Sequence, residues 1–457
     1  MSHSPDAIKL LIEHIENSTY EGLPESAVSA CKTFILDSIG VGISGSRVPN
    51  VAKIKQAISQ WGEAHQAQVW VTGEWMPAVS AAAINGYQIH NQEWDCVHEP
   101  AVVHPMAVIL SSLVAYAQQH NLSGQQLILG VVIAVDVATL IGQCVTSSLK
   151  FFRPSICGCL GATAGICAMQ SIQGETLHNA LGIAYSQLSG TMQSHVEGSP
   201  MLAMQIGINS SAGIRAVDMA VAGFAGPKDI LQGPYGYFQL FEDSFDLTPL
   251  VQKIGIEYQI EQVSHKPFPT GRAGHGTVDG LQQLQTQHGF SAQDIARIDV
   301  YATPLINKLV GRPIKDDMDA SYAKLCNGYI AASVLLAGSV AVADFEQEFL
   351  SDNTRLELGA KVFTHLNDTQ DLNALAPVTV MVTLNSGEEL TVNLQHVLGS
   401  PQNPLSREAQ LAKFKAAYHS AILAFDEFNL EHLINSIDQL EQIPNINSLV
   451  AALVRSR

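Results

Sequence analysis

The sequence predicts a mainly α-helical protein, in which a large all-helical domain carries a smaller, inserted α+β lid domain. Apolar residues recur at three- and four-residue spacing through the first half of the chain, as in helices. Alternating apolar and polar residues, typical of strands, begin only after about residue 263, and helical spacing returns after Pro401. We therefore assign residues 1–265 and 397–457 to the helical domain and 266–396 to the lid.

The first half is predicted to be helical from Glu25 to about Ala222. Small residues within 158–168 allow the backbones of neighbouring helices to approach closely. The most apolar stretch, 127–142, is interrupted by Asp136 and is too short to span a bilayer comfortably. We interpret it as a core helix.

The second half mixes strands with helices. Three segments alternate as strands do, and the last two are joined by the turn Asn385-Ser386-Gly387: 295–302, 378–384 and 389–396. Four segments show helical spacing: 276–287, 320–336, 413–425 and 430–442. We expect the last two helices to return to the first domain.

Composition limits the partners. The 457 residues carry a formal charge of -18, which argues against nucleic acid or an anionic membrane, because both require clustered lysine and arginine. A small anionic substrate is still allowed, since a pocket needs only two or three well-placed cations. The seven cysteines form no CxxC pair, and the first residues show no signal-peptide pattern, so we expect reduced thiols and a cytoplasmic protein.

One apparent nucleotide motif is discounted. Residues 40–45 read Gly-Val-Gly-Ile-Ser-Gly, which matches the GxGxxG of dinucleotide-binding folds. That fingerprint works only between a buried strand and a helix N-terminus. The preceding residues show helical spacing instead, so we interpret the glycines as a helix end and expect no cofactor.

The first candidate site is a polar cluster between two apolar stretches. Six ionisable residues lie within fifteen positions: His90, Glu93, Asp95, His98, Glu99 and His104. Such groups acquire shifted proton affinities against apolar walls and serve as acids and bases. His104 is the favoured functional histidine because Pro105 biases it away from helical geometry, whereas His98 and Glu99 are equally well explained as solvated loop residues. No HExxH pair is present, so we predict no metal.

The second candidate site is the strip 265–275, where the two predicted domains join. Lys266 and Arg272 supply positive charge suited to carboxylate capture, and His275 lies beside them. An exposed basic linker is the alternative. Arg153 could reach the same cleft or form a surface ion pair, and the segment with Tyr322 and Lys324 is either functional or structural.

These segments together resemble the MmgE/PrpD family, which includes 2-methylcitrate dehydratase, cis-aconitate decarboxylase and iminodisuccinate epimerase. The resemblance is carried by Asn85-Gly86, His104-Pro105 and the segments 158–168, 179–184, 223–227, 230–233, 266–279 and 399–401. It implies a helical domain with an α+β lid, a homodimer, no cofactor, and a site between the domains.

The chain departs from the family's lyases at several positions. Where they carry Asp-Phe-Asp-Asp-Thr, this chain has Glu93 to Val97, so the threonine is lost. Their lysine before a Leu-His-x-Gly element is missing from 202–207. One family histidine corresponds to Arg153, and another corresponds to Gly271. These departures argue against dehydration and decarboxylation.

We expect an enzyme that removes a proton next to a carboxylate of a small polycarboxylate, as an epimerase of the iminodisuccinate type. The predicted catalytic residues are His104 as base, with Lys266, Tyr322, Glu93 and Asp95. The predicted substrate-binding residues are His90, Arg153, Arg272, His275 and Lys324. The alternatives are a hydro-lyase or decarboxylase acting on 2-methylcitrate- or aconitate-like acids, and a non-catalytic protein that binds a carboxylate.

Overall fold

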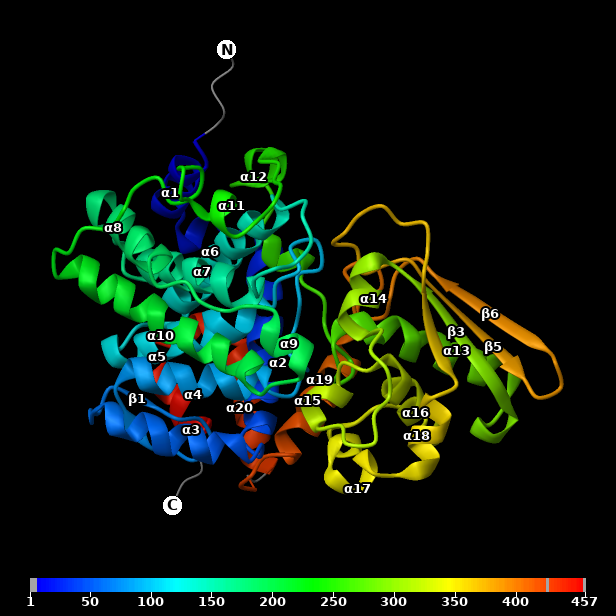
Figure 1. Cartoon of the computed structure of the whole chain (residues 1–457). Coiled ribbons are helices and arrows are strands. Elements are labelled where there is room, and N and C mark those ends of the chain that lie inside the picture. Colours follow the sequence, from blue (N-terminus) through cyan, green and yellow to red (C-terminus); the bar gives the residue numbers. More distant parts are fainter. Residues whose placement is uncertain (1–5, 425–426, 455–457) are drawn as a thin grey trace, which may run out of the picture.

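The computed structural model describes residues 6–424 and 427–454, which form a helical lobe and a smaller lobe that carries the main sheet (Figure 1). The long helices of the helical lobe are α1 (Ala7–Asn17), α2 (Glu25–Gly45), α3 (Asn50–Ile58), α4 (Ala78–His90), α5 (Pro105–His120), α6 (Gly124–Gln143), α7 (Arg153–Met169), α8 (Gly174–Tyr185) and α10 (Met201–Val221). Shorter helices are α9 (Gln193–Glu197), α11 (Tyr237–Leu240) and α12 (Thr248–Lys253).

Close helix packing forms the core of the helical lobe. Helices α6 and α7 run against each other, α5 packs on both, α10 packs on α7, and α4 packs on α5 and α10. A Cβ atom built on Gly161 would lie 2.4 Å from the carbonyl oxygen of Ala134, and one on Gly165 would lie 2.5 Å from that of Gly130. These short approaches confirm that the small residues of α7 allow backbone contact.

The smaller lobe is built on a four-stranded sheet in the order β4-β3-β5-β6. The strands are β3 (Ile295–Ala302), β4 (Val362–Leu366), β5 (Val378–Leu384) and β6 (Glu389–Leu394), with β3 and β4 parallel and the other pairs antiparallel. Its helices are α13 (His275–His288), α14 (Pro304–Val310), α15 (Ala320–Ala323), α16 (Asn327–Ala337), α17 (Gln347–Leu350) and α18 (Asn353–Gly359). Helix α13 packs on β5 and β6.

The last helices lie against the first ones, as expected. Helix α19 (Arg407–His419) packs along α2, where the Phe414 ring fills the space beside Gly40. Lys413 of α19 lies 2.6 Å from the buried carboxylate of Asp37 on α2. Helices α20 (Glu427–Asp438) and α21 (Asn447–Ala452) complete the chain, and the predicted helix 413–425 ends in a residue outside the described ranges.

The structure confirms the mainly α fold and the three predicted strands, with three corrections. The first half is not purely helical, because β1 (Ala67–Gln68) and β2 (Trp75–Met76) form a small hairpin. Strand β4 was missed, since its sequence, Val-Phe-Thr-His-Leu, does not alternate between apolar and polar residues. The predicted helix 320–336 is broken between α15 and α16, where Cys326 forms a bridge to Gly311. The division into domains and the lid stay predictions.

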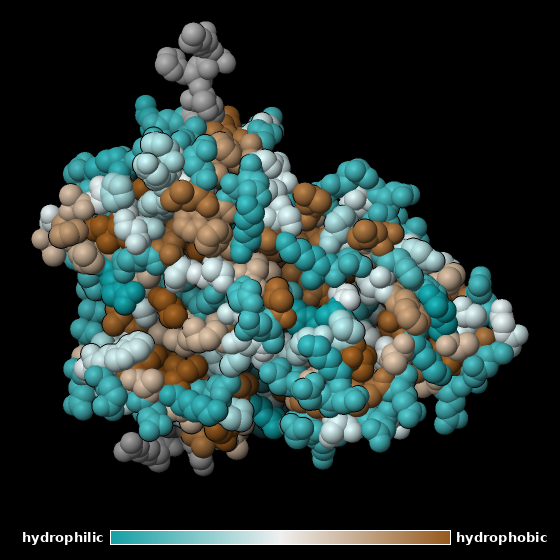
Figure 2. All heavy atoms as spheres, in the orientation of Figure 1, coloured by the Kyte–Doolittle hydropathy of each residue, from teal (hydrophilic) through white to brown (hydrophobic). Residues whose placement is uncertain are grey.

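The glycine-rich segment and the most apolar segment both lie in helices of the helical lobe. Residues 40–45 are the last residues of α2, as expected for a glycine-rich helix end. Helices α2 and α6 are long and apolar enough to span a membrane by length and composition, yet most of each is buried inside the lobe. Figure 2 shows apolar side chains among polar ones on the surface, and exposed apolar residues at the end of α10 include Met219, Val221 and Phe224.

Candidate active site

The first polar cluster lies in the loop that joins α4 to α5. His90 is the last residue of α4, and His104 precedes Pro105, the first residue of α5. Between them, Val97 pairs with Ser264 and so fixes this loop beside the second polar strip. Glu93 and Val102 both have φ near +53°, a conformation that non-glycine residues rarely adopt and that is concentrated at functional sites.

A buried carboxylate joins two imidazoles at the centre of this loop. Oδ2 of Asp95 lies 2.9 Å from Nδ1 of His90 and 3.4 Å from Nδ1 of His104. The contact with His90 is a hydrogen bond. The contact with His104 is within ion-pair distance only, and Nδ1 of His104 has no hydrogen-bond partner among the described residues. The two rings meet edge to face, with centroids 5.1 Å apart.

The two imidazoles differ in proton affinity. Burial lowers the pKa of His104, and the positive charge of Lys266 lowers it further, against the opposing effect of Asp95. Burial would also lower the pKa of His90, but the carboxylates of Asp95 and Glu93 outweigh burial and raise it. Neighbouring groups with separated pKa values are typical of an acid and a base at one site. His104 is thus suited to act as the base and His90 as the acid.

Lys266 holds the carboxylates of this cluster in place. Its Nζ atom is fully buried and lies 3.1 Å from both the backbone oxygen and Oε2 of Glu93, and 3.9 Å from Oδ1 of Asp95. Although burial opposes it, the charge of Lys266 lowers the pKa of Glu93 to about 2. Glu93 is therefore charged at neutral pH.

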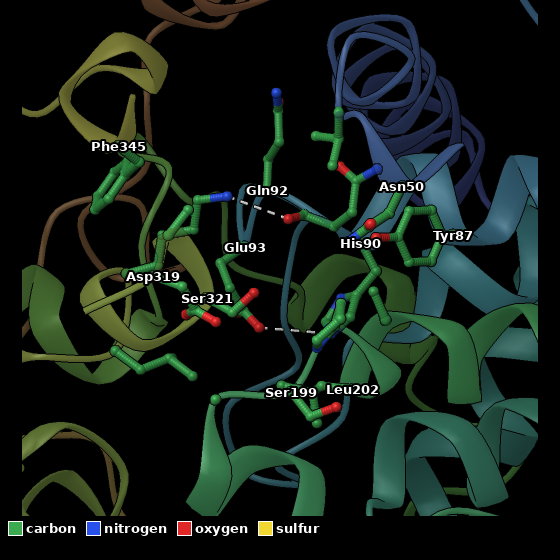
Figure 3. Close-up of a pocket in the computed structure, with 18 of the residues that line it drawn as sticks. Asn50, Tyr87, His90, Gln92, Glu93, Ser199, Leu202, Asp319, Ser321 and Phe345 are labelled. Carbon is green, nitrogen blue, oxygen red and sulfur yellow. Dashed lines mark hydrogen bonds and ion pairs between the residues drawn. The ribbon is translucent and has the colours of Figure 1, made fainter. Parts of the chain in front are cut away.

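Two adjoining chambers open beside these residues. The outer chamber is a cavity of about 500 Å³, and Figure 3 shows Tyr87 and His90 on one wall with Asp319, Ser321 and Phe345 across from them. The inner chamber is about 60 Å³ and is mostly apolar. Four residues line both chambers: His90, Glu93, Leu202 and Leu325. Segments far apart in the chain therefore share one crevice.

Five of the ten predicted site residues line these chambers: His90, Glu93, His104, Arg272 and Lys324. Arg272 is buried and lies 2.8 Å from Glu99, so the alternative of an exposed basic linker is wrong. Lys324 donates to the backbone oxygen of Asn91 at 3.2 Å, and burial lowers its pKa to about 8. Both residues line the crevice, but the Arg272 guanidinium is already paired with Glu99 and donates to the backbone oxygens of Val397 and Leu398, so carboxylate binding by these cations stays a prediction.

Asp95, Lys266 and His275 lie behind the chamber walls. Nε2 of His275 lies 3.3 Å from the backbone oxygen of Thr270, and burial holds its pKa well below the usual range. Asp95 contacts His90 and His104, and Lys266 contacts Glu93, so these two residues affect the pKa values of groups that line the crevice. His98, which could have been a solvated loop residue, is fully buried.

Arg153 and Tyr322 are placed away from the chambers. The Arg153 guanidinium is fully buried against Glu242 at 3.2 Å and donates to Asn373 at 3.1 Å, so neither a substrate contact nor a surface ion pair is seen. The Tyr322 hydroxyl donates to the backbone oxygen of Pro313. In this structure Arg153 ties the helical lobe to the segment between β4 and β5.

Several departures from the resembling lyases fall on the inner chamber, although Arg153 does not. Val97 and Gly271, where the resemblance implies threonine and histidine, both line it, and so does Leu202 from the segment without the lysine. His195 also lines this chamber and was missed by the sequence analysis. No motif surrounds His195, so only its proximity to other site residues in the folded chain reveals it.

His90, Asp95 and His104 also have the geometry of a possible metal site. One ligand atom from each lies within 4.8 Å of the others. Two imidazoles and a carboxylate suit a transition metal, although Lys266 beside Asp95 places a positive charge next to any cation bound there. The predicted independence from metal therefore stays a prediction.

A mainly helical protein with paired imidazoles and buried cations at a shared crevice has the features of an acid–base enzyme for a small anion. The sequence profile of the MmgE/PrpD N-terminal domain matches residues 9–250, and that of the C-terminal domain matches 268–430. The chain belongs to the MmgE/PrpD family.

Similar proteins cover almost the whole chain. Cis-aconitate decarboxylase of Mus musculus is 27% identical over 449 residues, which are 94% of this chain and 90% of that protein. Cis-aconitate decarboxylase of Homo sapiens is 24% identical, with 94% and 91% covered. A cis-aconitate decarboxylase-like protein of Aspergillus oryzae is 23% identical, with 94% of each covered. These relatives favour a lyase over the expected epimerase.

Proposed function

We propose that this protein is a cofactor-independent lyase that acts on a small polycarboxylic acid of the aconitate or 2-methylcitrate type. The observation that carries the proposal is the pair of imidazoles on one buried carboxylate, with the pKa of His104 lowered and that of His90 raised. The names of the relatives support this substrate class.

The chambers can hold such a substrate by its carboxylates. Arg272, which is paired with Glu99, lines the inner chamber, and Lys324 offers its charge in the outer one. In decarboxylation, the electron pair of the breaking C–C bond becomes enolate-like charge beside a remaining unsaturated or carboxylate group, and the His90 imidazolium returns a proton to carbon. In dehydration, His104 takes the proton from carbon and His90 protonates the leaving hydroxyl.

Decarboxylation is the favoured lyase reaction because of the apolar inner chamber. Its wall includes Leu149, Phe152, Leu309, Val310 and Leu375. A carboxylate among such side chains is poorly solvated, whereas the carbon dioxide it becomes is neutral, so the apolar wall favours the product of bond breaking.

Epimerisation is the second candidate, favoured by the missing threonine and histidine at Val97 and Gly271 on the inner wall. An epimerase needs one group to take the proton and another to return it on the opposite face. His104 and Lys324 lie in different chambers of the crevice and could divide these roles. No relative reported above is named as an epimerase.

Incubation in deuterium oxide, followed by NMR, separates the candidates. We expect cis-aconitate or a close analogue to lose carbon dioxide and to gain one deuterium on carbon. Loss of water from 2-methylcitrate would show a dehydratase. Exchange and stereochemical scrambling of iminodisuccinate, without a lyase reaction, would overturn the lyase proposal in favour of epimerisation.

The catalytic nature of the crevice has its own test. We expect His90→Gln to lower kcat by about a hundredfold or more, because His90 supplies the proton in decarboxylation and in dehydration, and a positioned acid or base contributes this much. Ligand affinity should stay nearly unchanged, and His288→Gln, at an exposed position, is the control. Equal turnover in His90→Gln and the control would remove His90 from the mechanism.

Metal independence can be checked by exhaustive chelation. We expect the rate to stay unchanged after chelation and after addition of zinc or iron, because Lys266 already neutralises the carboxylates of the cluster. A rate that falls and is restored by one metal would contradict this prediction.

We further propose that residues 266–396 act as a lid over the crevice, in a cytoplasmic homodimer. The contribution of this segment to both chamber walls supports the lid. The exposed apolar residues near the end of α10 are compatible with self-association. Size measurement in solution tests the dimer.

A further inference from the structure

The inner chamber contains a third imidazole, that of His195 on α9. This residue is only 6% exposed, and it lines the same small chamber as His90, Glu93 and His104. Helix α9 lies at the boundary between the helical lobe and the smaller lobe (Figure 1). Because these side chains line one small chamber of about 60 Å³, a ligand group that enters it finds polar partners on its wall.

Arg312 of the smaller lobe holds His195. Its Nη2 atom donates to the backbone oxygen of His195 at 3.0 Å and lies 3.2 Å from ring Nδ1 and 3.5 Å from Nε2. A guanidinium can only donate, so a ring nitrogen that accepts from it is the unprotonated one, and Nδ1 is the nearer of the two. With Nδ1 as the acceptor, the neutral imidazole carries its proton on Nε2, which makes Nε2 a hydrogen-bond donor.

The position of Arg312 is itself fixed by its neighbours. Its guanidinium lies over the Tyr322 ring, 4.8 Å from the ring centroid, and its backbone oxygen accepts from the Cys326 thiol. Its Nη1 atom is buried without a hydrogen-bond partner among the described residues, which costs stability. Because this buried guanidinium lowers stability and yet contacts a chamber histidine, we infer that it serves function.

The charged groups around His195 keep it neutral. Burial, and then the positive charge of Arg312, lower the pKa of His195 to about 4, and Lys308 acts in the same direction. Glu93 opposes these effects from the wall of the chamber. His90 and His104 are the other titratable groups that line the chamber with Arg272. At neutral pH, His195 therefore offers an uncharged donor.

We propose that His195 binds, through Nε2–H in the inner chamber, a substrate carboxylate other than the one that is lost, and that Arg312 is the positioning residue that fixes this tautomer. The inference rests on the proposed function for its ligand class, a small polycarboxylate. It adds a contact that depends on both lobes, because His195 belongs to the helical lobe and Arg312 to the smaller one.

Histidine-selective NMR tests the contact without turnover. Ring signals are labelled, and those of His195 and His104 are assigned with His195→Gln and His104→Gln. Propane-1,2,3-tricarboxylate, a saturated tricarboxylate, serves as the probe. We expect it to move the signals of both residues. In the free protein, Arg312→Gln should raise the titration midpoint of His195 from about 4 toward, but not to, 6.5, because burial remains.

Kinetics provide a second, independent test. We expect His195→Leu to raise KM about tenfold with little change in kcat, because it removes one hydrogen bond to a charged group. His195→Gln should restore part of the loss, since its amide can donate. Arg312→Gln should raise KM less, and should move the acidic limb of the KM profile upward in pH. The surface variants His288→Gln and Arg407→Gln are the controls.

The outcomes separate this inference from the proposed function. If the tricarboxylate moves His104 but leaves His195 unchanged, or if His195→Leu keeps the wild-type KM, the His195 contact is wrong and the lyase proposal stands. If the probe moves neither signal and no lyase reaction occurs, the substrate class is wrong and both proposals fall.

Discussion

At the scale of single residues, the proposed chemistry depends on how one buried carboxylate changes the pKa values of two histidines. Asp95 is fully buried, and the nearby histidines lower its pKa even though burial opposes them, so it stays ionised. It binds His90 closely and His104 at a longer distance. The unequal distances help to separate the two imidazoles into an acid and a base.

Asp95→Asn tests this separation. The carboxylate raises the pKa of both histidines, so its removal should lower both. Both lyase reactions require charged His90, so the alkaline limb of the kcat/KM profile should move to lower pH. Dehydration also requires neutral His104, so for that reaction the acidic limb should move the same way. Asn preserves the shape, so thermal unfolding should show a folded protein. An unshifted profile would contradict the assignment.

Lys266→Met tests the buried charge that organises the cluster. It leaves the Glu93 carboxylate buried without its cation, which should lower the free energy of unfolding by about 3–5 kcal/mol in urea. Because the pKa of Glu93 is depressed to about 2, its stabilising contribution is present above its unfolded value of 4.5 and is lost as pH falls toward 2. This part of the acid sensitivity should disappear in the variant.

The control for this prediction is the double variant Glu93→Gln with Lys266→Met, which removes both charges. It should be more stable than Lys266→Met alone, because no unpaired carboxylate is left buried. If the double variant is the less stable of the two, Lys266 does not act mainly by neutralising Glu93.

At the scale of elements, glycine spacing decides which helices can touch. Helix α7 lies so close to α6 that a Cβ on Gly161 has no room beside the Ala134 carbonyl. Gly213 of α10 also faces α7, but its Cβ would meet Ala162 at 3.2 Å. The small residues in the sequence indicated that neighbouring helices approach α7 closely. Among the glycines of α7, the structure shows the shortest approach at Gly161.

The same substitution at these two glycines should therefore differ. We expect Gly161→Ala to lower the free energy of unfolding by about 1–3 kcal/mol through overpacking. Gly213→Ala should change stability by less than about 1 kcal/mol, since its clash can relax and alanine favours the helix. Urea unfolding of both variants is the measurement, and equal effects would contradict the packing argument.

At the scale of the whole molecule, the crevice exists because two lobes meet. Arg47 beside α2 lies 3.0 Å from Glu346 of the smaller lobe, and both line the outer chamber. Both side chains are roughly half exposed, so the pair adds little to stability. In a chain with a charge of -18, Arg47 instead offers positive potential where an anion enters.

Arg47→Gln should therefore affect binding more than folding. We expect the melting temperature to stay unchanged and KM for the polycarboxylate to rise a few-fold at low salt. At about 0.5 M salt, the difference from wild type should shrink, because ions screen the attraction. Arg407→Gln, which breaks an exposed ion pair with Asp438, is the matched control. A salt-independent effect on KM would exclude steering.

Much of the fold was predictable because it depends on local patterns. Helices such as α6 and strands such as β3 follow from apolar spacing. The site was predictable only in part. His104 was found from its neighbour Pro105, whereas His195 has no local signal. Arg153 resembled a substrate ligand in sequence, but its partner Glu242 lies 89 positions away and was not visible.

The sequence by itself determined the mainly helical fold, the strands β3, β5 and β6, and two polar strips rich in imidazole and cationic groups, because each depends on neighbours within a few residues. Only the tertiary structure decided which of these groups face the crevice, which lie behind it, and that His195 joins them. The physical reason is that burial and pairing set both access and proton affinity, and these depend on residues brought together from distant parts of the chain.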